Sequence, residues 1–281
     1  MKKTLLVLVA FTMLLVMVTS AQAALVMKYD LSGLGAGLGQ TTVWDEQILT
    51  TVDATSNYAA GIFPGAGFVD VGDLKMGTLN YLGNPLSGAQ NQDLNGSWEL
   101  TGRWSDLTGT MTAITPTASG TLFNFIYTSG TAKLFADPTV NANFGAGIGS
   151  NDDTASTFTD GTELASIKLL SGVGSLFVPF DGSAATGSTF TKWDILSVPA
   201  GYWLDPTGFD LKSSLEASGW VDVNTIVSSN VTITGTGPGS QILSRNQGHA
   251  SYNVPEPASM LLFGMGMLGL GATKLRRKKV N

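Results

Sequence analysis

Long charged side chains are scarce along most of this chain, and this scarcity constrains its fold more than any other feature. Only 13% of the residues are Asp, Glu, Lys or Arg, whereas glycine alone contributes 35 residues. Long helices need Lys, Arg and Glu on their solvent-facing side, and this chain has few to offer. Residues 98–104 instead alternate, with Trp, Leu, Gly and Trp on one face and Glu, Thr and Arg on the other. We therefore predict an all-β ectodomain over residues 24–234, built as a single jelly-roll-like β-sandwich.

Short runs of β-forming residues separated by turn signals support this fold class. Besides 98–104, the predicted strands are Leu25–Tyr29, Val43–Val52, Gly67–Leu82, Thr108–Thr115, Leu122–Tyr127, Thr131–Phe135, Glu163–Leu170, Ser175–Phe180 and Asn230–Thr234. Leu122–Tyr127 is apolar on both faces, which predicts a buried central strand. Asp210–Ser218 is compatible with one short helix. Residues 235–253 are rich in Gly, Ser, Asn and Gln, a composition that predicts a flexible tether.

The first 23 residues have the three parts of a secretory signal peptide. Lys2 and Lys3 precede the apolar stretch Leu5–Val18, and Ala21 and Ala23 form an A-x-A cleavage site, so we expect the mature chain to begin at Ala24. The alternative is an uncleaved anchor, but the apolar stretch is short for a span of about 20 residues. We therefore expect export through the Sec machinery and cleavage by signal peptidase.

The last 28 residues also form an ordered series of signals. Val254, Pro255, Glu256 and Pro257 come first, and because proline fixes its own φ and disfavours helix in the preceding residue, this strip is stiff and extended. The apolar run 258–273 follows and is a predicted transmembrane helix, although it is marginally short for the bilayer. A basic cluster then predicts a cytoplasmic stop: Lys274, Arg276, Arg277, Lys278 and Lys279.

This arrangement resembles the PEP-CTERM sorting signal of Gram-negative bacteria, with its proline–glutamate–proline strip, apolar run and basic tail in the same order. The resemblance implies export across the inner membrane, retention in the membrane, and processing by an exosortase before release to the surface or the extracellular matrix. More loosely, Phe135–Pro138, Leu164–Gly172 and Tyr202–Pro206 resemble segments of PEP-CTERM proteins associated with flocculation. That likeness implies a role in cell aggregation linked to exopolysaccharide, in a biofilm or floc, and it transfers no catalytic residue.

The charge of the exported part limits its partners. Residues 24–254 contain eight Lys and Arg against twenty Asp and Glu, which gives a formal net charge of −12. We expect no nucleic-acid partner, because phosphate binding needs clustered Lys and Arg. Cations, or a matrix bridged by divalent cations, fit this charge better. The chain has no cysteine, which removes thiol catalysis and cysteine-based metal sites from consideration.

Catalytic arrangements are difficult to assemble from this sequence. The single histidine, His249, falls in the predicted tether, so a Ser-His-Asp arrangement on a rigid scaffold is not expected. Glycosidases need two carboxylates across a cleft, and the sequence alone does not pair any. We therefore expect a non-enzymatic protein, with a hydrolase as the least favoured alternative.

A calcium- or carbohydrate-binding module is the main alternative function, and we expect no other cofactor. Asn151, Asp152, Asp153 and Asp160 are candidate calcium ligands, because calcium takes hard oxygen ligands from loops. The same residues also favour turns simply for local hydrogen bonding.

Aromatic side chains offer a second kind of ligand site. Tyr202 and Trp203 lie in a turn-rich stretch, so we expect them to be exposed and available to stack on sugars. Buried aromatic residues also dominate the cores of sandwiches, and we expect Trp98 and Trp104 to be core residues.

Overall fold

The computed structural model describes residues 25–35, 37–149 and 153–254, apart from the side chains of residues 228–230. Residues 24–253 form one compact unit. Its elements in chain order are β1 (Lys28–Tyr29), the 3-10 helix η1 (Ser32–Leu34), β2 (Glu46–Tyr58), β3 (Gly67–Tyr81), β4 (Asn84–Pro85), β5 (Glu99–Pro116), β6 (Gly120–Ser129), β7 (Thr131–Asp137), the 3-10 helix η2 (Ala155–Phe158), β8 (Thr162–Pro179), β9 (Thr186–Ser197), β10 (Trp203–Leu204), α2 (Lys212–Ser218), β11 (Trp220–Ile233) and β12 (Ser240–Asn253).

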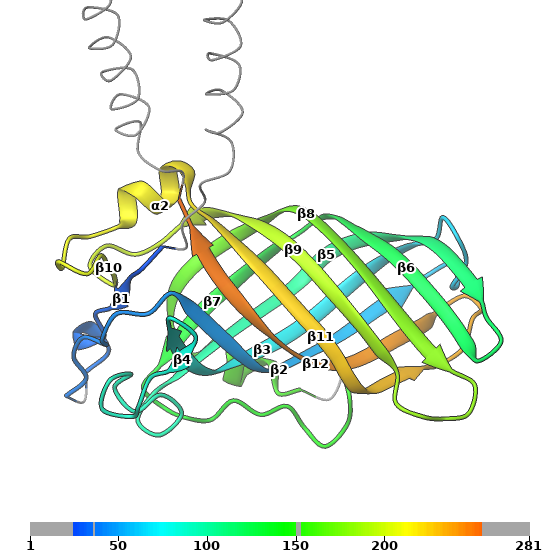
Figure 1. Ribbon diagram of the computed structural model, residues 1–281, viewed down its shortest axis with the longest axis horizontal. Coiled ribbons are helices and arrows are strands. Elements are labelled where there is room, and N and C mark those ends of the chain that lie inside the picture. The colour runs from blue at the N-terminus through cyan, green and yellow to red at the C-terminus, as the bar shows by residue number, and fades with distance from the viewer. Residues whose placement is uncertain (1–24, 36, 150–152, 255–281) are drawn as a thin grey trace, which may run out of the picture. The chain divides into compact units, whose positions relative to one another are not determined.

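The long strands form one antiparallel sheet that closes on itself (Figure 1). The hydrogen-bonded order is β3-β2-β12-β11-β9-β8-β6-β5, and an additional pairing between β3 and β5 completes the ring. The result is a barrel-like sheet of eight strand positions, in which every long strand has a neighbour on both sides. Closure leaves no long exposed edge for pairing with another chain.

β6 and β7 together occupy one of the eight positions. β6 lies between the second half of β5 and the second half of β8. β7 lies between the first halves of the same two strands. Gly130 joins them with φ of 147°, and a Cβ atom there would lie 2.6 Å from the Cα of Leu107. Glycine is therefore required at this bend, because a side chain has no room.

One end of the sheet is filled by an aromatic plug that consists of Tyr29, Trp44, Trp98, Trp203 and Tyr252. All five are buried, and the ring centroids of Tyr29 lie 4.9 Å from those of both Trp44 and Trp203. The short β1–β10 sheet carries two plug residues across this end (Figure 1). The indole nitrogen of Trp203 donates to the carbonyl of Leu164 at 2.8 Å, so the plug is tied to the closed sheet.

A hydrophobic cluster fills the opposite end, beside the hairpins that join β2 to β3, β5 to β6, β8 to β9 and β11 to β12. We call it the hairpin cluster; it consists of Tyr58, Ile62, Ala66, Phe68, Met111, Phe123, Leu176, Ala185, Val227 and Ile242. Glycines on neighbouring strands make room for rings that point inward. A Cβ atom on Gly174, for example, would lie 2.3 Å from the ring of Phe125.

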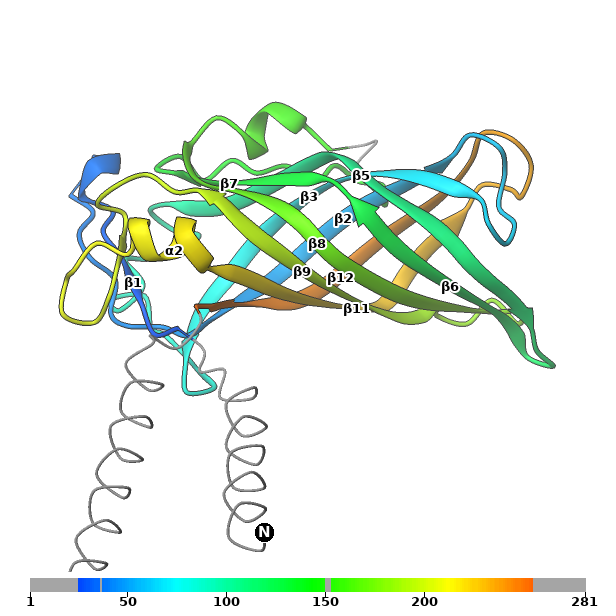
Figure 2. The ribbon, with the colours of Figure 1, turned by 90° about the horizontal axis from the view of Figure 1, so that it is seen from above.

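The connection between β7 and β8 crosses the outer face of the sheet over β3 and β5 (Figure 2). It buries three carboxylates completely: Asp53, Asp73 and Glu99. Arg245 pairs with Asp53, Arg103 pairs with Asp73 at 2.6 Å, and Lys75 pairs with Glu99 at 2.6 Å. Backbone N–H groups of the connection also donate to Glu99. Because buried charges are costly without partners, the ion pairs stabilise the covered carboxylates. The hydrogen bonds to Glu99, and one from Arg245 to the carbonyl of Phe144, hold the connection on the sheet.

The structure confirms the all-β fold and corrects its architecture. The prediction of a sandwich is wrong, because the β3–β5 pairing closes one sheet instead of stacking two. Leu122–Tyr127 is a strand, but it is not buried on both faces, since Ile126 is 39% exposed on the outside. The short helix is confirmed as α2.

The prediction of a flexible tether over residues 235–253 is also wrong. Most of this segment is β12, which pairs with β2 along one side and with β11 along the other. His249 therefore lies in a paired strand, opposite Ile48 and Asn224. The predicted all-β domain accordingly extends to Asn253 instead of ending at residue 234.

The predicted signal peptide (1–23), the apolar run (258–273) and the basic cluster lie outside the described residues. Within the described ranges, no helix has the length and hydropathy that a membrane crossing requires.

Candidate functional site

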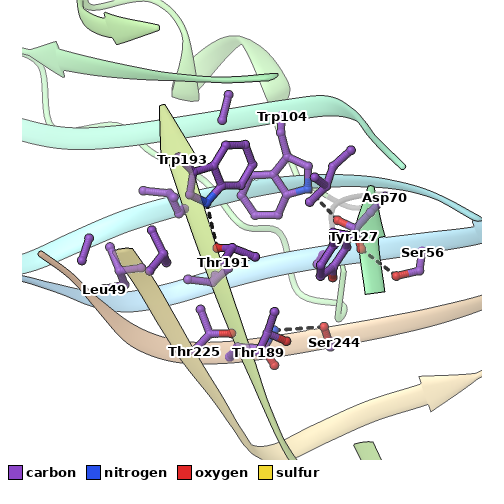
Figure 3. A pocket seen from close by; sticks show the side chains of 18 of the residues that line it. Leu49, Ser56, Asp70, Trp104, Tyr127, Thr189, Thr191, Trp193, Thr225 and Ser244 are labelled. Carbon is purple, nitrogen blue, oxygen red and sulfur yellow. Dashed lines mark hydrogen bonds between the residues drawn. The ribbon is translucent and has the colours of Figure 1, made fainter. Parts of the chain in front are cut away.

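The middle of the closed sheet contains a cavity of about 120 Å³ between the aromatic plug and the hairpin cluster. Its lining comes from strands all round the ring, and Figure 3 shows the inward-pointing side chains. Most of the wall is apolar or aromatic. Several hydroxyl groups interrupt it, and the polar side chains that form hydrogen bonds lie around Asp70 and around Asn246.

Asp70 faces the cavity through the simple alternation of β3, which also points Phe68 and Leu74 inward. Asp73 has the opposite parity and faces outward under the β7–β8 connection. Alternation with Phe68 was the sequence signal that could have identified Asp70 as an interior residue. An acidic residue among apolar ones is the informative exception in such a pattern.

Asp70 is 1% exposed, and neutral donors from the two neighbouring strands give each oxygen of its carboxyl group one hydrogen bond. The hydroxyl of Ser56 on β2 donates to Oδ2 at 2.6 Å, and the indole nitrogen of Trp104 on β5 donates to Oδ1 at 2.6 Å. Burial raises the pKa of Asp70 to about 6, and these two hydrogen bonds oppose that rise. Burial, with the nearby Asp70 charge, also raises the pKa values of Tyr58 and Tyr127.

The second polar group lies on β9 and β12. The indole nitrogen of Trp193 donates to the hydroxyl of Thr191 at 2.7 Å, and the amide nitrogen of Asn246 donates to the hydroxyl of Ser244 at 3.1 Å. The other amide atom, Asn246 Oδ1, is buried and has no hydrogen-bond partner among the described residues. Nothing in the sequence of β12 distinguishes Asn246 from the other polar residues around it.

Among the described residues that line the cavity, Asp70 alone carries a carboxyl group. The cavity therefore lacks the second carboxylate that a glycosidase would need opposite the first. What the wall provides is an apolar enclosure with hydrogen-bond acceptors at two places, an arrangement suited to holding a small molecule.

The predicted calcium ligands do not come together in the described structure. Asn151 and Asp152 lie outside the described residues. Asp153 lies near Asp53 and Asp73; burial and those two charges raise its pKa to about 8.

Asp160 has different neighbours, since it accepts a hydrogen bond from Asn141 at 3.0 Å and lies beside Asp137. No group of three His, Asp or Glu in the described ranges is placed to hold a metal ion.

The two residues predicted to bind carbohydrate differ in their exposure to solvent. Trp203 is 0% exposed as a member of the aromatic plug, so the prediction that its ring is available for stacking is wrong. Tyr202 is partly exposed, and its hydroxyl lies against Gly33. Trp98 and Trp104 are confirmed as core residues, at 0% and 9% exposure.

The sorting strip begins where the sheet ends. β12 ends at Asn253, Val254 follows it, and Pro255, Glu256 and Pro257 lie outside the described residues, as do Ala21, Ala23 and Ala24 at the predicted signal cleavage site.

Comparison with known families identifies this end of the chain. The PEP-CTERM protein-sorting motif matches residues 253–278, which confirms the predicted signal. No curated protein and no solved structure gives a match to the chain. The motif implies export, anchoring in the membrane before processing, and an exosortase as the processing partner. Residues 253–278 of this chain therefore form a PEP-CTERM protein-sorting motif.

Proposed function

We propose that the processed domain is a non-enzymatic component of the cell surface or extracellular matrix that promotes exopolysaccharide-associated cell aggregation, as in a biofilm or floc. The sorting motif supplies the route to that location. The acidic surface of the domain supports the mode of action, and this is the observation on which the proposal rests.

The distribution of charge on the domain leaves carboxylates in excess. Five described ion pairs engage five of its eight basic side chains: Lys75, Arg103, Lys133, Lys212 and Arg245. A sixth, Lys192, lies over the ring of Trp220 at 4.2 Å. Exposed carboxylates such as Asp93, Asp106 and Asp181 therefore face solvent with few cations to offset them. Such a surface repels its own copies at low ionic strength and attracts divalent cations, which can bridge it to an acidic polysaccharide.

Clumping of cells tests this proposal directly. Cells that display the protein should clump more in millimolar calcium and disperse with a chelator, and a deletion strain should respond less to both. Equal dispersal in the two strains would contradict a cation-bridging role, because it would assign the whole calcium response to the matrix.

A matched pair of variants distinguishes the effect of exposed carboxylates on clumping from the effect of a buried one. Replacing the exposed residues Asp93, Asp106 and Asp181 with Asn should reduce calcium-dependent clumping. Asp70→Asn should leave clumping unchanged, because it removes a carboxylate that does not face solvent. Equal clumping by the triple variant and the parent protein would show that surface charge does not carry the effect.

A further inference from the structure

The interior cavity has features that packing alone does not explain. A closed sheet of eight strands has an interior that side chains can just fill, or that can hold one small ligand. Here apolar side chains fill both ends, and about 120 Å³ is left between them. An apolar cavity of about 150 Å³ binds benzene, so this somewhat smaller space limits a guest to a body no larger than one ring.

The polar atoms on the cavity wall include acceptors that are not fully used. Asp70 receives two hydrogen bonds, from Ser56 and Trp104, and an ionised carboxylate can accept about four. Asn246, which is 8% exposed, presents a buried amide oxygen with no partner among the described residues. Leaving a buried acceptor unsatisfied costs free energy, so both positions favour a guest that brings N–H donors.

The charge of the Asp70 carboxylate limits the class of guest further. None of the described residues that line the cavity is a Lys or Arg, so the buried carboxylate of Asp70 has only neutral partners in the wall. A buried carboxylate is most stable beside a cation. Phe125, Tyr127 and Trp104 line the same cavity, and aromatic faces also attract cations.

We propose that the cavity binds one small aromatic amine, with its ammonium group beside Asp70 and its ring against the aromatic wall. Because side chains are packed at both ends of the sheet, the guest enters only when one end opens transiently. Binding measurements therefore need long equilibration.

The test uses the full chain purified in detergent, with benzylamine as the probe and benzyl alcohol as its neutral counterpart of similar size. Calorimetry after overnight equilibration should give saturable binding of benzylamine. Asp70→Asn should weaken benzylamine at least about tenfold, the loss expected for one charge-assisted hydrogen bond, and leave benzyl alcohol nearly unchanged. Asp194→Asn is the matched control, because it makes the same substitution at a position where β9 pairs with Lys168 of β8 and the side chain faces away from the cavity.

Two results would overturn the proposal: no binding of benzylamine at millimolar concentration, or equal affinity in the parent and Asp70→Asn proteins. A crystal of the parent protein soaked with 4-bromobenzylamine gives a test that needs no variant. Anomalous bromine density inside the sheet near Asp70 supports the site. Density only outside the sheet, or ordered water filling the cavity of the soaked crystal, contradicts it.

Discussion

Replacing Asp70 with Asn should stabilise the exported domain at neutral pH and change the pH dependence of its stability. Burial raises the pKa of Asp70 from an ordinary value of 3.8 to about 6, so the folded domain binds this proton more tightly than the unfolded chain does. The charged form therefore costs stability, and this cost grows as the pH rises between about 4 and 6. One pKa unit corresponds to about 1.36 kcal/mol, so the cost above pH 6 is about 3 kcal/mol.

Asn can keep one hydrogen bond to each of the two side chains that Asp70 contacts. Its amide oxygen can accept from Trp104, and its amide nitrogen can donate to the hydroxyl of Ser56, which can rotate to accept. We therefore expect the variant to be more stable than the parent domain by up to about 3 kcal/mol at pH 7.5, with little difference at pH 4.

Urea denaturation of residues 24–254, followed by circular dichroism at several pH values, measures this difference. Asp73 and Asp153 also titrate with raised pKa values, but they are present in both proteins, so the difference between the two isolates Asp70. Asp194→Asn serves as the outer-face control. A stability difference that stays constant from pH 4 to pH 8 would refute the assignment of Asp70 as a buried carboxyl group that ionises near pH 6.

Three further predictions follow from the fold and the sorting motif. A domain that ends at Thr234 loses β12 and should fail to fold, whereas one that ends at Val254 should be soluble and rich in β-structure by circular dichroism; equal folding of the two would contradict the closed sheet. Trp203→Ala should destabilise the domain by about 3–5 kcal/mol and Tyr202→Ala by much less, and similar losses in denaturation midpoints would contradict the buried plug. Glu256→Ala should leave the precursor in the membrane fraction, since the apolar run and basic cluster remain; normal release would show that this glutamate is not needed for sorting.

Local alternation predicted much of the fold because it reports which strands have one face inward. Gly67–Leu82 was predicted within one residue of β3, and 98–104 with 108–115 covers most of β5. Closure was not predictable in the same way. It depends on the pairing of β3 with β5, and period-two patterning is equally compatible with a sandwich.

The interior explains why β12 and β9 were missed. Rings from other strands occupy much of the inside, so the inward positions in the middle of β12 are small or polar, as at Ser244, Asn246 and Ala250. β9 likewise places Thr189 and Thr191 inward and exposes Phe190 at 48%. In both strands the usual contrast between apolar inward and polar outward residues is weak or reversed, and a tether or loop becomes the natural prediction.

The sorting signal and the cavity likewise differ in how far the sequence could predict them. The sorting signal was predictable because its function lies in a contiguous segment, and the family comparison matches it at residues 253–278. The cavity was not predictable, because Asp70, Ser56, Trp104 and Asn246 come from four strands that only the closed sheet brings together. The exposure of Trp203 was predicted wrongly for a related reason. Its turn-rich neighbours in the sequence do not reveal that residues from distant strands bury its ring.

The most direct test of sorting is the intact mass of the extracellular protein from its native host. The last strand of the closed sheet ends at Asn253, and the matched motif starts at the same residue. Processing can therefore remove the tail without disturbing the sheet. We predict a species that begins at Ala24, retains β12 through Asn253, and lacks the apolar run and basic cluster. A protein that keeps Asn281 throughout, or one cut upstream of Asn253 within β12, would contradict the account.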